Sequence, residues 1–389
     1  LPRVSIDFYL PSLPHIGDVL HANDTSLQMT LTIFMFGYAL SMLIAGYLSD
    51  TLGRKRVLIY GLILYFISTI ACAVSTSIIF LITARFFQAL GGCCGTVIAR
   101  VMVKDAYSRE EQIKILSYLS AAMAICPLLI PILGGISQTF LGWRAVFYIL
   151  ALFSLLLLIF SKRQINESHI DNHSTSLRIL FGYYKQLITN RLFIGYSIAI
   201  GLAWCDYFAF TLESSFLLQK NLGFNPIIFG GFLSIVVSGY LIGTQITKRF
   251  ANEIGWDNLI FIATIICLFG SLLLTTLNIL FVLNWITIVL PMIIIMSGVG
   301  IIIPCTQAAV MQPFSKIAGT ASGLFFFIQM IFGGVCGLVL QAFKHNSATP
   351  MILIILICSL MLVCIFYTLI WKFKKEEINN AAQPFFEKV

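Results

Sequence analysis

The stretch Gly46-Tyr47-Leu48-Ser49-Asp50-Thr51-Leu52-Gly53-Arg54-Lys55-Arg56 separates two long apolar runs and decides how the chain is arranged. Residues 27–49, which run into its start, contain no charged side chain, and neither do residues 57–84, which follow it. A glycine-bounded turn with this many charges cannot lie in hydrocarbon, so it marks a membrane surface. Its consecutive cations predict the cytoplasmic surface, because short loops rich in Lys and Arg stay on that side. This turn therefore orients every other segment.

The composition of the 389-residue chain predicts an all-α polytopic membrane protein. Hydrophobic residues make up 59% and charged residues 10%, whereas a typical soluble domain is about 25% charged. The net charge of +8 comes from Lys and Arg in alternate loops, which is the pattern of membrane topology and not of a nucleic-acid-binding surface. All ten Cys lie in apolar runs without a Cys-x-x-Cys pair. We therefore expect no nucleic-acid partner, disulfide, metal or cofactor.

The apolar runs predict twelve spans, since about 20 residues cross a bilayer as a helix. The first run, residues 1–20, is polar by His15 and is interpreted as a helix truncated at its N-terminus. The expected spans are 1–20, 27–49, 57–75, 78–103, 112–138, 143–162, 192–219, 226–247, 258–278, 285–311, 317–343 and 349–371.

The longest polar segment, residues 163–191, divides these spans into six plus six. The prediction is an N-terminal six-helix bundle (1–162), a cytoplasmic linker (163–191), a C-terminal six-helix bundle (192–372) and a cytoplasmic tail (373–389). A surface helix is expected near Leu177–Leu187. Gly243 to Gly255 repeats the position of Gly46 to Gly53 in the second half, and internal repeats are typical of transporters.

Ionisable residues inside the expected spans are candidates for function, because each costs roughly 2.5–3.5 kcal/mol at a helix centre. They occur in the first, fourth and seventh spans only, so we expect these spans to meet at a polar cavity. The residues are Arg3, Asp7, Arg85, Arg100, Asp206 and Glu213.

Asp7 and Arg85 are expected at the same depth, within one helical turn. An ion pair between them has two interpretations: a proton carrier whose charge changes during transport, or a static pair that joins two helices. Asp206 and Glu213 are seven residues apart and share a helix face with Phe210 between them. Carboxylates beside an aromatic ring suit a cation with apolar bulk, although Glu213 can also lie hydrated near the helix end.

These residues belong to motifs that resemble the major facilitator superfamily, and within it the twelve-helix drug:proton antiporters of the Bcr/CflA type. Gly46–Arg56 is similar to the superfamily's cytoplasmic loop motif. Residues 85–92 resemble the motif of the fourth helix, and Ile6-Asp7-Phe8-Tyr9-Leu10-Pro11 resembles a first-helix motif of the group. The run from 127 to 135 resembles the antiporter motif of the fifth helix, in which prolines bend the helix and glycines permit close contact. Its residues are Pro127, Pro131, Gly134 and Gly135.

The resemblance implies a fold of two six-helix bundles around a central cavity, and it implies roles for individual residues. Proton coupling falls to Asp7 and Arg85. The expected substrate cavity comprises Asp206, Glu213, Phe210, Tyr9 and Gln88. The expected conformational latch comprises Gly46, Asp50, Gly53, Arg54 and Lys55.

The resemblance also implies a function: a proton-coupled secondary transporter that exports small amphipathic compounds by alternating access. The alternative is a dedicated proton-coupled transporter of a siderophore, amino acid or polyamine, with uptake included. An enzyme is not expected, because the spans contain no clustered nucleophile and base. We expect a monomer in the bacterial cytoplasmic (inner) membrane, with both termini cytoplasmic and with protons, a small-molecule substrate and lipid as its partners.

Overall fold

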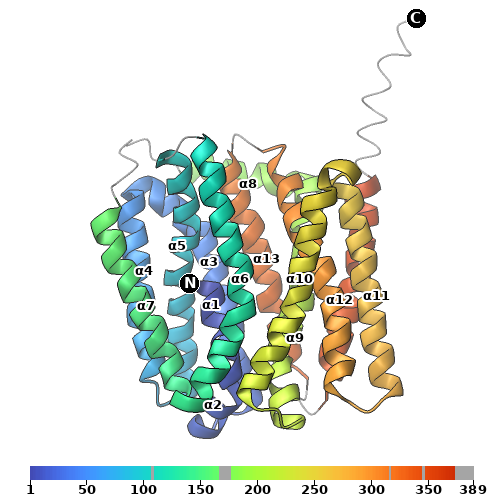
Figure 1. Ribbon diagram of the computed structural model, residues 1–389. Helices are drawn as coiled ribbons and strands as arrows, with labels where there is room; N and C mark the ends of the chain where they lie inside the picture. The colour runs from blue at the N-terminus through green and yellow to red at the C-terminus, as the bar shows by residue number, and fades with distance from the viewer. Residues whose placement is uncertain (107–108, 166–176, 315–316, 344–346, 373–389) are drawn as a thin grey trace, which may run out of the picture.

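The computed structural model is a bundle of long helices that run alternately up and down (Figure 1). The structure describes residues 1–106, 109–165, 177–314, 317–343 and 347–372, and the described residues contain no strand. The fold class predicted from the sequence is therefore confirmed.

The helices before the linker surround a first segment that is broken twice. Their bounds are α1 (Pro2–Asp7), η1 (Leu10–Ser12), α2 (Leu13–Leu20), α3 (Asp24–Leu52), α4 (Arg54–Ala73), α5 (Ile78–Ala106), α6 (Arg109–Leu141) and α7 (Trp143–Gln164).

The helices after residue 176 begin with a short one that does not run along the bundle. Their bounds are α8 (Leu177–Thr189), α9 (Arg191–Ser215), η2 (Phe216–Asn221), α10 (Pro226–Ile254), α11 (Trp256–Leu280), α12 (Trp285–Met311), α13 (Ala318–Gln341), α14 (Thr349–Ile365) and η4 (Phe366–Trp371).

Ten helices among the described residues are long and apolar enough to cross a membrane. Ten of the twelve expected spans correspond to them. The expected span 1–20 is instead divided into α1, η1 and α2, in which prolines stand at the start of each piece. The expected span 112–138 lies within α6, whose described apolar part runs from Ile125 to Leu141.

The charged stretch 46–56 is almost entirely helical, contrary to the expected turn. α3 continues to Leu52 and α4 begins at Arg54, so Gly53 alone separates them with φ 90° and ψ 145°. Gly255 separates α10 from α11 in the same way, with φ 84° and ψ 153°. Positive φ is accessible to glycine without a steric penalty, which explains why one residue suffices at both places.

α3 and α10 also match in length and in their first residues. Each has 29 residues, and each is capped by an asparagine, Asn23 or Asn225, whose side chain accepts a hydrogen bond from a backbone N–H of the first turn. The repeat inferred from the glycines thus extends over a whole helix.

Two pairs of helices join the parts of the chain before and after the linker: α3 packs on α13, and α6 packs on α10. Glycines make the second contact close. A Cβ atom added at Gly135 would collide with the carbonyl oxygen of Pro226, and one added at Gly230 would collide with that of Pro131. Gly134 makes a similarly close contact with the turn between α1 and η1, since a Cβ atom added at Gly134 would lie 2.5 Å from the Phe8 carbonyl oxygen.

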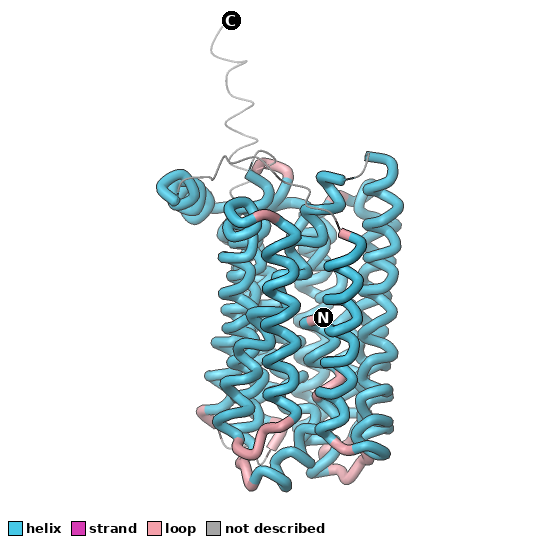
Figure 2. Tube along the Cα trace, turned by 90° about the vertical axis from the view of Figure 1, so that its left-hand side faces the viewer, coloured by secondary structure: helices cyan, strands magenta, loops and turns pink. Residues whose placement is uncertain are grey.

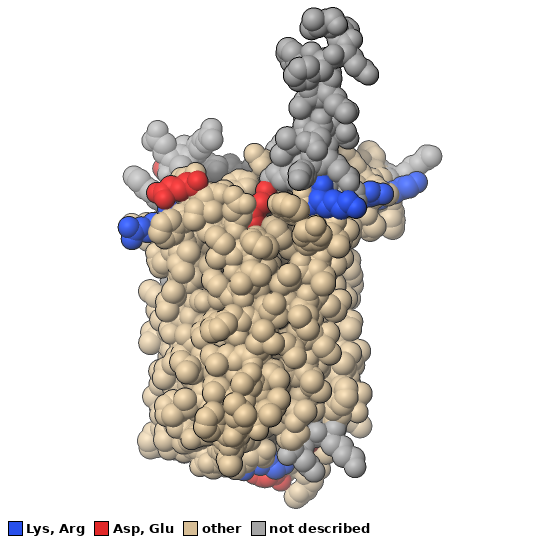
Figure 3. Space-filling view, turned by 90° about the vertical axis from the view of Figure 1, so that its right-hand side faces the viewer, with Lys and Arg blue, Asp and Glu red and all other residues tan. Residues whose placement is uncertain are grey.

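The face of the molecule drawn in Figure 3 has a broad belt without charged side chains between two ends that carry them. We call the end where α8 lies the linker end, and the opposite end, where α2 lies, the α2 end. α8 crosses the direction of the other helices at the linker end and is seen nearly end-on, outside the profile of the bundle, at the upper left of Figure 2.

Candidate functional site

The short helix α1 presents polar side chains on two different faces. Arg3 and Asp7 are four residues apart and share one face, while Ser5 lies on another face, on the same side as Tyr9 in the turn that follows α1. Because successive residues are about 100° apart on a helix, these two faces point in nearly opposite directions. The first face meets α9 and the second meets α3, α4 and α5.

The α9-facing side of α1 carries an ion pair within the helix, and a hydrogen bond and two aromatic rings of α9 contact this pair from the other part of the chain. Arg3 Nε donates to Asp7 Oδ2 at 3.0 Å, and the Tyr207 hydroxyl donates to Asp7 Oδ1 at 3.3 Å. The Arg3 guanidinium carbon lies 4.6 Å from the centre of the Tyr207 ring and 5.4 Å from that of Trp204. Asp7 is buried, whereas the Arg3 side chain is 33% exposed. A carboxylate, a cation and two aromatic rings therefore form one cluster.

The other side of α1 faces Arg85 of α5, whose side chain is fully buried. Arg85 Nη1 donates to the Ser5 carbonyl oxygen at 3.2 Å and to Gln88 Oε1 at 2.7 Å. Its guanidinium carbon lies 4.5 Å from the Tyr9 ring centre and 4.4 Å from that of Phe34. Gln88 donates onward to Thr69 Oγ1 at 2.9 Å. No described carboxylate pairs with this charge, so π faces and carbonyl oxygens replace one.

The expected ion pair between Asp7 and Arg85 is not formed. Arg85 does reach α1, as the depth estimate predicted, but it contacts Ser5 and not Asp7. The reason is the helical rotation between residues 5 and 7, which turns the carboxylate toward α9. Asp7 instead forms its ion pair with Arg3, which lies one turn earlier on α1.

Asp206 lies inside the part of the bundle formed after the linker. It is fully buried, Ser359 on α14 donates to its Oδ2 at 3.2 Å, and its Oδ1 has no hydrogen-bond partner among the described residues. Phe210, one turn later, is also fully buried. In this conformation neither residue lines an open cavity.

Glu213 contacts the other part of the chain. Gln28 Nε2 on α3 donates to Glu213 Oε1 at 3.0 Å. Two residues later, Ser215 donates to the Leu10 carbonyl oxygen at 3.0 Å. Asp206 and Glu213 therefore face different surroundings, although they are seven residues apart on one helix.

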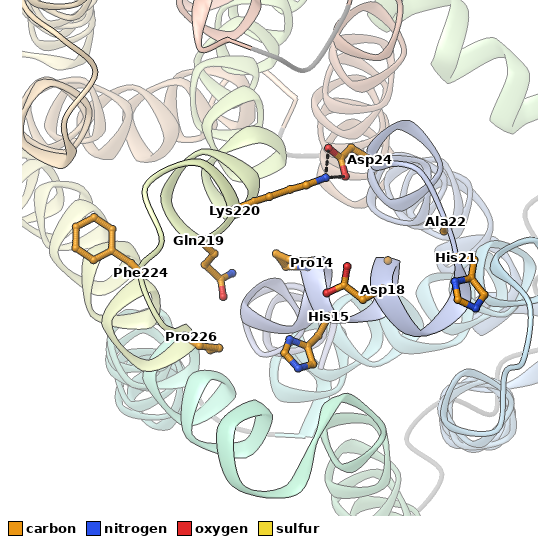
Figure 4. Close-up of a pocket in the computed structure, with 11 residues that line it drawn as sticks. Pro14, His15, Asp18, His21, Ala22, Asp24, Gln219, Lys220, Phe224 and Pro226 are labelled. Carbon is orange, nitrogen blue, oxygen red and sulfur yellow. Dashed lines mark hydrogen bonds and ion pairs between the residues drawn. The ribbon is translucent and has the colours of Figure 1, made fainter.

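A third contact between the two parts lies at the α2 end. Lys220 Nζ on η2 is 3.0 Å from Asp24 Oδ1 on α3, across a hollow of about 600 Å³ (Figure 4). Together with Gln28–Glu213 and Leu10–Ser215, this ion pair forms a series of polar contacts that joins the two parts of the chain toward the α2 end. The hollow is lined by Pro14, His15, Gly17, Asp18, His21, Ala22, Asp24, Gln219, Lys220, Phe224 and Pro226.

The expected latch residues lie at the linker end. Gly53 supplies the break between α3 and α4, and Arg54 is buried at the start of α4. A Cβ atom added at Gly46 would meet no atom within 4 Å. The side chains of Asp50 and Arg100 lie outside the described residues, so the role of Asp50 stays a prediction.

Sequence reasoning identified Asp7 but missed Trp204 and Tyr207, which surround its ion pair. The four-residue spacing of Arg3 and Asp7 was the available signal for that pair. No group of three or more His, Cys, Asp or Glu side chains among the described residues is arranged to hold a metal ion. The cluster can bind a proton or a cation, and it lies where the two parts of the chain meet.

Comparison with known proteins gives a family and a fold. The sequence model of the Major Facilitator Superfamily matches residues 3–338. An uncharacterized MFS-type transporter, YdgK, of Bacillus subtilis is 28% identical, with 90% of this chain and 88% of that protein covered. A bicyclomycin resistance protein homolog of Haemophilus influenzae is 26% identical, with 95% and 93% covered. The crystal structure of a D-xylose-proton symporter is 15% identical and has a TM-score of 0.75 over 95% of both chains.

Proposed function

The chain belongs to the Major Facilitator Superfamily, and we propose that it is a proton-coupled exporter of small amphipathic compounds. The observation that carries the proposal is the buried Asp7 carboxylate on α1, which is bonded to Arg3 and to Tyr207 of α9. A protonatable group at the contact between two moving bundles can link its own charge to their arrangement. The bicyclomycin resistance protein homolog supports export of such compounds.

In the proposed cycle a proton from outside binds Asp7 Oδ2. The neutral carboxylic acid no longer holds the Arg3 guanidinium against the Trp204 and Tyr207 rings, and it accepts more weakly from the Tyr207 hydroxyl. The contact between α1 and α9 therefore weakens, and the bundles change their arrangement. Release of the proton on the cytoplasmic side restores the ion pair. The membrane potential adds about 2.3 kcal/mol per charge per 100 mV to this inward movement. Arg85, held by Gln88 and Ser5, is proposed to keep α1 in place while Asp7 changes its charge.

The Arg3 contacts suggest which cargo fits. Its guanidinium lies against one carboxylate and two aromatic rings, which are the groups that bind an organic cation with apolar bulk. We propose that a cationic cargo takes this position when Arg3 moves aside. Asp206, Glu213, Phe210, Tyr9 and Gln88 are buried here, so their proposed contact with cargo requires another conformation.

The topology of the proposal follows the basic residues. The linker end is proposed to face the cytoplasm of a bacterium, with both termini on that side and the protein acting as a monomer in the inner membrane. The second candidate is a dedicated metabolite transporter. The acids Asp206 and Glu213 of α9 favour it, because carboxylates select a metabolite that carries positive charge.

Reconstitution into vesicles tests the function. Vesicles with an imposed proton gradient are given cationic, neutral and anionic compounds, including bicyclomycin, and cargo and internal pH are followed together. Cargo movement opposite to protons supports the exporter. Movement of one metabolite together with protons supports the second candidate, and movement unaffected by the gradient contradicts both.

A further inference from the structure

α8 carries an apolar strip that the rest of the described chain leaves uncovered. Its 13 residues include Phe181 and Ile188, whose exposed fractions are 69% and 55%. They are seven residues apart, so the two side chains lie on one side of the helix, two turns from each other. Tyr184 lies between this uncovered strip and the bundle, half-buried against the core, and this burial raises the pKa of its phenol.

The other sides of α8 have different surroundings. Leu187 is fully buried and fixes the helix to the bundle, where α8 contacts α9 and α13. Lys185, Gln186 and Thr189 are exposed and form a polar face, whose N-terminal end also carries the exposed Ile179. The helix is therefore amphipathic, with an anchoring edge, an uncovered apolar strip and a polar face.

The position of α8 identifies what covers the strip. The helix lies across the direction of the spanning helices, at the level of the linker end and beyond the profile of the bundle (Figure 2). The bundle wall below this level is built of helices apolar enough to span a membrane, and the face drawn in Figure 3 shows no charged side chain there. Because the spanning helices end at the level of α8, this helix is placed where a surface of a surrounding bilayer is expected.

We propose that α8 is an interfacial lipid-binding helix, whose Phe181 and Ile188 side chains enter the headgroup–acyl boundary of the bilayer. Amphipathic helices of this kind lie in the plane of the interface with the apolar face buried. Lys185 borders the strip, and its long side chain reaches the headgroup phosphates while the stem stays on apolar surface. Because Leu187 ties α8 to α9 and α13, the lipid contact holds the bundle after the linker at a fixed depth. This inference does not depend on cargo or on proton coupling.

Tryptophan placed on each face of α8 tests the proposal. Phe181→Trp and Gln186→Trp are made in the full chain and reconstituted in vesicles with ordinary or brominated acyl chains, since bromine quenches nearby indole emission. The added emission is measured against the unmodified protein, which carries its native Trp residues in both lipids.

We expect brominated lipid to remove most of the emission added by Phe181→Trp and little of that added by Gln186→Trp. Ile188→Trp serves as a second reporter on the strip if the first variant is poorly folded, and thermal unfolding checks each variant. Equal quenching on both faces, or quenching on neither face, overturns the proposal. Quenching of Gln186→Trp alone would mean that the helix is turned the other way, with its apolar strip covered by protein.

Discussion

Asp7 and Asp206 are both buried carboxylates in the middle of the bundle, and their surroundings differ in every respect. Asp7 has a cation, a hydroxyl donor and contacts from a helix on the other side of the linker. Among the described residues, Asp206 has a single side-chain donor, Ser359, from its own side. Tyr207, which bonds Asp7, directly follows Asp206 on α9, so adjacent residues on one helix serve different faces. If Asp7 is the coupling site, as proposed, then burial alone does not identify such a site, and a partner that can separate is also needed.

The largest effect is expected from Asp7→Asn. The amide cannot change its charge by binding a proton, and it forms no ion pair with Arg3. Proton-driven transport in vesicles should fall to the level of protein-free vesicles, while the melting temperature and membrane insertion show a folded protein. Normal transport by this variant would remove Asp7 from the mechanism and end the contrast with Asp206.

A smaller loss is expected from Tyr207→Phe. It removes one hydroxyl donor from Asp7, and a hydrogen bond contributes roughly 0.5–1.5 kcal/mol, so the initial transport rate should fall about three- to tenfold. Ser359→Ala is the matched control, because it removes the one donor from Asp206. If both variants slow transport equally, the two carboxylates are not distinguished by their partners.

Lys220→Gln should have a weaker effect. The ion pair with Asp24 joins the two parts at the α2 end, but its lysine side chain is 57% exposed, and exposed pairs contribute about 0.2–1 kcal/mol. Transport rates at low salt should change less than about fivefold, and the change should vanish near 1 M salt, where charges are screened. The exchange Lys220→Asp with Asp24→Lys should restore the original rate. A change that persists in high salt would indicate that the side chain acts through packing.

The smallest effect is expected from Asp206→Asn. Asparagine retains an oxygen that accepts from Ser359, so transport of neutral cargo should stay within about twofold of the unmodified rate. Cationic cargo should be slowed more than neutral cargo, because the proposed function places it against this carboxylate in another conformation. Equal rates for both kinds of cargo would remove Asp206 from the proposed cargo contacts.

The fold was largely predictable because the hydrophobic runs are long and the punctuating residues are strong. The runs predicted the helices from α3 onward, and Gly53 and Gly255 marked their breaks. The prediction of a turn at 46–56 was wrong because a single glycine with positive φ replaces a loop. The charged residues on either side of it continue the helices.

The site was predictable only as a set of residues. An Asp in an apolar run is unusual, which identified Asp7, but its partner depends on the rotation of α1 within the bundle. Helical spacing placed Asp206 and Glu213 on one face and could not tell that Ser359 faces one and Gln28 the other. The contacts of Tyr207 and Lys220 join segments far apart in sequence, so tertiary packing alone determines them.

The matched ends of α3 and α10 have a consequence for how the protein is made. Asn23 and Asn225 begin these helices through bonds to their own first turns, and Gly53 and Gly255 end them through their own backbone. The signals that set their length are therefore local, and each helix can reach its final extent on leaving the ribosome, before the helices that follow it are synthesised. α1, whose side chains are bonded to helices synthesised later, must wait for them. The order of synthesis and the order of completion are thus different in this protein.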